Sequence, residues 1–324
     1  MPRKILALLL CLLGVCMLWT PGAQAAGEAP ETWPTETFAQ GRGPWWLSGP
    51  LTRLVYLMKG RSPTKSLLIL REGELIYEHY NRKSDETTAF DIYSVTKSVV
   101  ATLTGIAVYE GAITSLDQKV IDFFPEAQAL LPADSNKRDM TVDHLITMKS
   151  GLDPALEDTW QQSADSGLGA FLSAQKYAPG TTYEYVGPSF HLLACLVSRA
   201  VGMPLLDYAN EKLFGPLGIT SVQWNRWPDG SYIGPSEISM TARDMLRLGY
   251  LWLHDGRWED KQLLAADFIT QARPTEKNGY GRSFWNNEVG PFTLKNSFEA
   301  AGWGGQYISI FPSSNMIIVR TGGW

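Results

Sequence analysis

Apolar residues recur with strand-like and helix-like spacing in different parts of the chain. Near each end, two apolar runs of strand length flank a short stretch of turn-forming residues. The runs near the N-terminus, 66–70 and 74–80, predict a β-hairpin in which Gly73 supplies the positive φ of the turn. Those near the C-terminus predict strands over 302–311 and 316–321.

Between these strands, apolar positions recur every three or four residues, as in helices that pack one face against a core. The predicted helices cover 51–59, 94–109, 142–148, 189–200, 204–214, 241–254 and 262–272. An irregular arm rich in Pro, Gly and Trp precedes them at 26–50. Strands at both ends predict an α+β fold, an α/β sandwich. Its antiparallel sheet combines N- and C-terminal segments, is flanked by helices, and has a mainly helical region inserted at about 112–225.

The first 25 residues have the pattern of an export signal. Two basic residues at 3–4 precede an apolar run at 5–19, and the small-residue site Ala-Gln-Ala follows at 23–25. The apolar run is shorter than the roughly 20 residues that cross a bilayer, which favours cleavage over a retained anchor. We therefore expect a signal peptide at 1–25, one functional unit at 26–324, and a periplasmic or secreted protein without a stable membrane span.

Charge and cysteine content narrow the classes of partner. The formal net charge is −5, and a mildly acidic surface argues against nucleic acid or anionic lipid as a partner. Two of the three cysteines lie in the predicted signal, so Cys195 remains, on an apolar helix face where we expect a buried structural thiol. The four histidines show no metal-binding spacing. We expect a small-molecule substrate, with no metal and no cofactor.

The pattern Ser-x-x-Lys occurs three times, and on a helix this spacing places hydroxyl and amine on one face. The copy at 62–65 lies in a Pro-containing loop, and the copy at 173–176 closes a short helical stretch. Only Ser94 opens a long apolar helix, whose packing holds its first turn rigid. We therefore predict Ser94 as a nucleophile and Lys97 as its base, provided that burial or a nearby cation favours the neutral amine.

Two other segments offer the remaining groups that an activated serine needs. Tyr185 lies in a turn-rich loop, and its phenol can relay a proton between Lys97 and the leaving group, although such tyrosines are often packing residues. The glycine-rich segment 299–307 enters a predicted strand. The N–H groups of Ser94 and Gly305 can together form an oxyanion hole, with a glycine bulge as the alternative.

The order and context of these segments resemble the serine beta-lactamase-like family. That family includes penicillin-binding DD-peptidases, class C beta-lactamases, family VIII esterases and 6-aminohexanoate-dimer hydrolase. Ser94-Val95-Thr96-Lys97 matches its first motif, Tyr185 the tyrosine of its Tyr-x-Asn motif, and Gly302-Trp303-Gly304 the place of its Lys/His-Thr-Gly motif. The resemblance covers about residues 50–321. It implies a beta-lactamase/transpeptidase-like fold and an exported serine hydrolase that works through an acyl-enzyme.

Two departures from the family motifs shape the expected substrate. Gly187 replaces the Asn of the second motif, and Gly302 replaces the cation of the third, which pairs with the carboxylate of a β-lactam or D-Ala-D-Ala peptide. The Gly-Trp-Gly-Gly form looks like the 6-aminohexanoate-dimer hydrolase branch, which implies a linear amide or ester. The expected lining of an apolar acyl pocket is Trp303, Tyr183, Tyr280 and Trp285. The alternatives are a beta-lactamase or DD-peptidase, and a non-catalytic module that binds cell-wall peptide.

The end of the chain is a third departure. The family continues into a C-terminal helix that covers the sheet, whereas this sequence ends at 322–324. Unless that face is covered otherwise, we expect apolar strand surface to be exposed on it.

Overall fold

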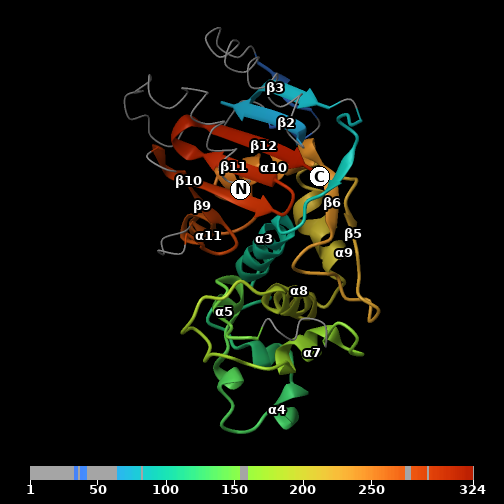
Figure 1. Ribbon diagram of the computed structural model, residues 1–324, viewed down its shortest axis with the longest axis vertical. Coiled ribbons are helices and arrows are strands. Elements are labelled where there is room, and N and C mark those ends of the chain that lie inside the picture. The colour runs from blue at the N-terminus through green and yellow to red at the C-terminus, as the bar shows by residue number, and fades with distance from the viewer. Residues whose placement is uncertain are drawn as a thin grey trace.

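The computed structural model describes residues 33–35, 37–41, 64–81, 83–153, 160–273, 279–289 and 292–323. A β-sheet with its packed helices forms one half of the molecule, and a mainly helical region forms the other (Figure 1). Helix α3 (Val95–Tyr109) lies where the two halves meet. The predicted signal, the predicted helix at 51–59 and most of the predicted arm fall outside the described residues.

The main sheet has seven strands in the order β1-β3-β2-β12-β11-β10-β9. The strands are β1 (Ala39–Gln40), β2 (Thr64–Arg71), β3 (Glu74–Tyr80), β9 (Trp285–Val289), β10 (Phe292–Gly302), β11 (Gln306–Phe311) and β12 (Met316–Gly322). C-terminal β12 lies between β2 and β11, so both ends of the chain build one sheet, as predicted. The sheet is mixed rather than purely antiparallel, because the short β1 pairs with β3 in parallel.

The predicted hairpin is confirmed as β2 and β3. Both central residues of its turn have positive φ, 52° at Glu72 and 82° at Gly73. This is the backbone of a type I′ turn, whose twist matches that of the flanking strands. The C-terminal hairpin of β11 and β12 turns through Pro312–Ser314 and ends at Asn315, which has a φ of 43°.

Helices α3 and α10 (Ala242–Leu253) cover the inner face of the sheet, with α11 (Ala266–Ala272) beside them (Figure 1). A capping box fixes the start of α10: the Thr241 side chain accepts from the Asp244 N–H, and the Asp244 carboxylate accepts from the Thr241 N–H. The helix predicted at 262–272 begins too early. Lys261–Gln262 is strand β8, paired with β7 (Arg257–Trp258), and the Gln262 amide bonds backbone carbonyls on both sides.

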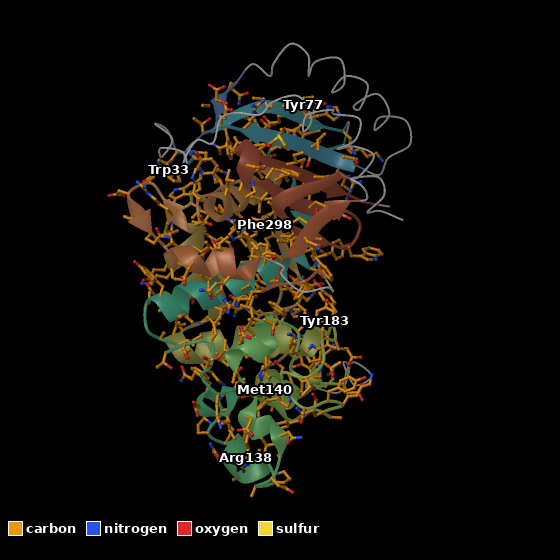
Figure 2. The ribbon with its side chains drawn as sticks, turned by 90° about the vertical axis from the view of Figure 1, so that its left-hand side faces the viewer. Trp33, Tyr77, Arg138, Met140, Tyr183 and Phe298 are labelled. Carbon is orange, nitrogen blue, oxygen red and sulfur yellow. The ribbon has the colours of Figure 1, made fainter. Side chains whose placement is uncertain are left out.

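The helical half is organised around α8 (Gly187–Val201), which packs on α3, α5 and α7. The other helices are α4 (Ala127–Leu130), α5 (Val142–Ile146), α7 (Ser166–Leu172) and α9 (Leu205–Ala209). Helix α8 ends at Gly202 with a φ of 69°, the left-handed cap that the sequence predicts. The helix predicted at 204–214 is divided: α9 is followed by a π-helical turn at Asn210–Phe214. In Figure 2, Met140 and Arg138 mark the end of this half farthest from the sheet.

Three further strands join the two halves: β4 (Ala89–Asp91), β6 (Ile238–Thr241) and β5 (Gln223–Trp224), in the order β4-β6-β5. The face of the main sheet that points away from α3 and α10 is buried at Leu67, Ile69 and Ile318. The exposed apolar surface expected on that face is therefore not observed. In the described part of the chain no single helix is long and apolar enough to span a membrane. The pair Gly187–Val201 and Leu205–Phe214 meets those criteria only together, and is bent by 76°.

Candidate active site

Ser94 lies at the junction of the two halves, immediately after a strained residue. Tyr93 has a φ of 48°, a conformation that is costly for a bulky side chain. The Tyr93 N–H donates to Asp91 Oδ1 at 2.8 Å, and the Ile92 N–H donates to the Ile238 carbonyl at 2.9 Å. These bonds tie the approach to α3 to the small sheet. They hold Ser94 at the helix N-terminus, where it is the cap residue.

The Lys97 amine reaches Ser94, as the three-residue spacing predicts. Lys97 Nζ lies 3.2 Å from Ser94 Oγ and donates to the Pro235 carbonyl at 2.8 Å. Lys97 is only 4% exposed. Burial penalises a charged ammonium, whereas the hydrogen bonds that Nζ donates stabilise it; to act as the base, Lys97 must be neutral. Sequence reasoning missed Pro235, since a backbone carbonyl leaves no side-chain signal.

Tyr185 completes the group of predicted catalytic side chains. Its ring centroid lies 4.8 Å from Lys97 Nζ, and the Ser94 side chain is close enough to its hydroxyl to affect its pKa. Tyr185 is 39% exposed, so a substrate can contact it. Desolvation nevertheless raises the pKa of Tyr185, and the Ser94 side chain opposes this only in part. At neutral pH the phenol therefore keeps its proton and can donate it to a leaving group.

Removal of the Tyr185 hydroxyl is expected to slow turnover without preventing folding. Tyr185→Phe keeps the ring packing but loses proton donation, so kcat for ester hydrolysis should fall about 100-fold. Tyr177→Phe, a change in the preceding loop segment, is the matched control. Steady-state kinetics of both variants check this prediction, and equal kcat values for the two would contradict it.

Tyr183, Tyr185, Tyr280 and Trp285 form one cluster, the aromatic wall. Ring centroids lie 5.5 Å apart for Tyr183 and Tyr280, 5.7 Å for Tyr185 and Trp285, and 4.7 Å for Tyr280 and Trp285. Figure 2 shows Tyr183 at the junction between the sheet and the helical region. Three of the four residues predicted to line the acyl pocket thus meet beside Tyr185.

Trp303 lies apart from the aromatic wall. Its ring packs edge-on against Tyr93, with centroids 5.3 Å apart, and the residue is 58% exposed. This contact places Trp303 against the residue that directly precedes the nucleophile. The four predicted lining residues therefore belong to two separate surfaces, and their role in substrate binding stays a prediction.

The glycine-rich segment enters a strand, as the sequence suggested, but it also leaves one, so the strand predicted at 302–311 begins too early. Gly302 is the last residue of β10, 303–305 form a turn, and β11 begins at Gln306. A Cβ at Gly302 would collide with the Ile92 carbonyl. Position 302 therefore cannot carry the Lys or His of the family motif unless the backbone shifts.

Gly305 is placed in the turn with a φ of 89°, which favours glycine. Its N–H donates to the Gly302 carbonyl at 3.3 Å, longer than the usual value of about 2.9–3.0 Å. Within the described ranges, the Ser94 N–H has no hydrogen-bond acceptor. The Gly305 N–H, which makes a long hydrogen bond, and the Ser94 N–H are both compatible with an oxyanion hole. That role stays a prediction.

Of the other two Ser-x-x-Lys copies, the one that the structure describes in full, 173–176, lacks this geometry. Ser173 caps the end of α7, and Lys176 pairs with Glu184 at 3.1 Å near the surface. Ser62 lies outside the described residues, whereas Lys65 belongs to β2. Cys195 is buried and unpaired in α8, as expected for a structural thiol. No group of three or more potential metal ligands occurs among the residues described.

Comparisons with known proteins identify the family of the chain. The family model described as Beta-lactamase matches residues 37–321. The 6-aminohexanoate-dimer hydrolase of Paenarthrobacter ureafaciens is 24% identical over 300 residues, which cover 81% of this chain and 73% of that protein. A D-aminopeptidase of Brucella anthropi is 24% identical over 270 residues, 75% of this chain and 50% of that protein.

Solved structures share the fold. A class C beta-lactamase from Rhodobacter sphaeroides superimposes with a TM-score of 0.67 at 18% identity, covering 85% of this chain and 94% of that one. The architecture is thus the beta-lactamase/transpeptidase-like fold that the motifs implied. With the match over 37–321, it establishes that the chain belongs to the Beta-lactamase family of serine hydrolases.

Proposed function

We propose that the protein is an exported serine hydrolase that cleaves a linear amide or ester through an acyl-enzyme. The observation that carries this proposal is the contact of Lys97 Nζ with Ser94 Oγ at 3.2 Å, with the ring centroid of Tyr185 4.8 Å from the same amine. A nucleophile, a buried amine and a protonated phenol are the groups that acyl transfer requires.

In the first half-reaction, Ser94 Oγ attacks the carbonyl carbon and its proton passes to the neutral Lys97 amine. The carbonyl oxygen becomes an oxyanion that accepts hydrogen bonds from the N–H groups of Ser94 and Gly305. The bond to the leaving amine or alcohol then breaks. Tyr185 gives its proton to the leaving group and regains one from the Lys97 ammonium.

In the second half-reaction, water attacks the ester on Ser94. A proton of the water passes through Tyr185 to Lys97. The bond between the acyl carbon and Ser94 Oγ then breaks, and Ser94 regains a proton from the Lys97 ammonium. The free acid leaves, and the enzyme returns to its starting protonation state.

An uncharged acyl group fits the surroundings of Ser94 better than an anionic one. Within the aromatic wall, Trp285 packs against Tyr185, and Trp303 packs against Tyr93, the residue before Ser94. The usual cation of the third motif is replaced by Gly302, which packs against the Ile92 carbonyl. This combination supports a linear amide or ester, in line with the similarity to a 6-aminohexanoate-dimer hydrolase.

A fluorophosphonate probe tests the hydrolase proposal directly. We expect the folded protein to be labelled once, with the adduct located on Ser94 by peptide mass spectrometry. The peptide containing Ser173 should stay unmodified and serves as the internal control. A folded protein that is not labelled, or is labelled elsewhere, would favour the non-catalytic binding module instead.

The substrate class is tested by comparing a p-nitrophenyl ester, a linear ω-amino amide and a chromogenic cephalosporin. We expect the ester or the amide to be turned over with a much higher kcat/KM than the cephalosporin. Rapid cephalosporin turnover would overturn the argument from Gly302 and support a beta-lactamase.

Export is proposed on the N-terminal sequence pattern of 1–25. N-terminal sequencing of the protein recovered from a secreting bacterial host should give a chain that begins near Ala26. Recovery of intact Met1 in the membrane fraction would instead indicate a retained anchor.

A further inference from the structure

Arg320 is a buried cation directly beneath the turn that follows β10. It lies on β12 and is 6% exposed. Its Nε donates to Thr64 Oγ1 at 2.9 Å, and its Nη1 donates to the Gly305 carbonyl at 2.5 Å. No carboxylate pairs with Arg320 anywhere in the described part of the chain. A buried guanidinium without an acidic partner is costly, so its position calls for a reason.

The turn 303–305 is shaped around this guanidinium. A Cβ at Gly305 would collide with Arg320 Nη1, and a Cβ at Gly322 would approach the same atom to 2.9 Å. Both positions are glycine, which leaves room for the arginine fork. Gly305 also has a φ of 89°, so its backbone conformation and the space for Arg320 depend on the same residue.

A second side chain ties the turn to β12. The Gln306 amide nitrogen donates to the Gly322 carbonyl at 3.1 Å, and the Gly322 N–H donates to Gln306 Oε1 at 3.1 Å. Arg320 and Gln306 therefore hold the turn from the side of β12. Its opposite end is fixed where Gly302 packs on the carbonyl of Ile92, two residues before Ser94.

We propose that Arg320 is a positioning residue, which orients the Gly305 N–H toward the oxyanion by holding the Gly305 carbonyl from β12. This inference rests on the proposed hydrolase function. By fixing the Gly305 carbonyl, Arg320 restricts rotation of the glycine. The long bond from the Gly305 N–H to Gly302 can then be exchanged for a shorter one when the carbonyl oxygen of the substrate becomes charged. Its effect is confined to the transition state, so it should alter kcat rather than KM.

Arg320→Met tests the proposal, with Arg71→Met on neighbouring strand β2 as the matched control. We expect Arg320→Met to lower kcat for a p-nitrophenyl ester about 100-fold, with KM changed by less than about threefold. Affinity for a boronic acid, which forms a tetrahedral adduct on serine, should fall in parallel with kcat. Arg71→Met should leave all three quantities near those of the wild type.

Arg320→Lys serves as a second variant if the methionine variant does not fold. It keeps the charge but cannot bond Thr64 and Gly305 through one planar fork, so kcat should fall about tenfold with KM unchanged. Folded variants that keep wild-type kcat and boronate affinity, or that change only KM, would overturn the role of Arg320. A wild-type protein without Ser94-dependent hydrolysis would instead overturn the proposed function.

Discussion

Replacement of Lys97 by methionine is expected to lower kcat/KM for ester hydrolysis by about 10⁴-fold, the scale of losing a general base from a serine hydrolase. The Lys97 amine lies 3.2 Å from Ser94 Oγ, so it is placed to take the proton when the serine attacks. Methionine fills a similar volume and leaves no buried charge. The structural cost includes the lost hydrogen bond to the Pro235 carbonyl, about 1–2 kcal/mol.

The chain provides a matched control in its other described Ser-x-x-Lys sequence. Lys176→Met removes a lysine at the same spacing from a serine, but one that pairs with Glu184 at the surface. We expect this variant to keep wild-type activity. Stopped-flow or steady-state ester hydrolysis and the rate of fluorophosphonate labelling should fall together in Lys97→Met while circular dichroism is unchanged. A folded Lys97→Met enzyme within about tenfold of wild type would show that another group is the base.

Ser94 and Lys97 were predictable because their relation is local. Two residues three positions apart at the start of a helix lie on the same face, however the rest of the chain folds. The apolar positions after Lys97 predict that the helix is buried. The hairpin at Gly73 and the capping box at Thr241 were predictable for the same reason. In each, residues within four positions determine the backbone.

Features that depend on distant segments were predicted less well. The aromatic wall joins a loop before α8 to residues near β9, while Trp303 packs on Tyr93 instead. From the sequence alone, each aromatic residue has the same apolar character, and the partners against which its ring packs cannot be predicted. Strand β9 and much of β10 were also missed. Strand β9 pairs with β10 and β10 with β11, and their own sequence, 285–301, carries many polar residues.

Arg320 illustrates the same limit at the site itself. An arginine in an apolar strand gives no indication of which turn it will bond, and Gly305 precedes it by fifteen positions. The family motif at 302–304 suggested only that a cation was missing. The register of β11 with β12, which aligns Tyr307 with Arg320, brings the guanidinium under the turn.

Acidification between pH 6.5 and about 4 is expected to destabilise the fold through two buried histidines. His191 on α8 is fully buried, bonded to Ser166 Oγ at 2.7 Å and stacked on Trp160 at 4.6 Å. Burial lowers the pKa of His191 from 6.5 to about 4, although nearby Asp229 acts in the opposite direction. Burial, with repulsion from Arg257, likewise lowers the pKa of His254 to about 4.

The sign of the effect follows from proton uptake. Below pH 6.5 the unfolded chain binds protons at both histidines while the folded chain does not, so stability falls with decreasing pH until the folded residues protonate near pH 4. For His191 the loss amounts to about 3 kcal/mol across this window, and the same lowered pKa makes the loss for His254 comparable. Urea unfolding at successive pH values measures it. His191→Gln and His254→Gln should each flatten the dependence and the double variant most of all, whereas an unchanged slope in the double variant would place the acid sensitivity elsewhere.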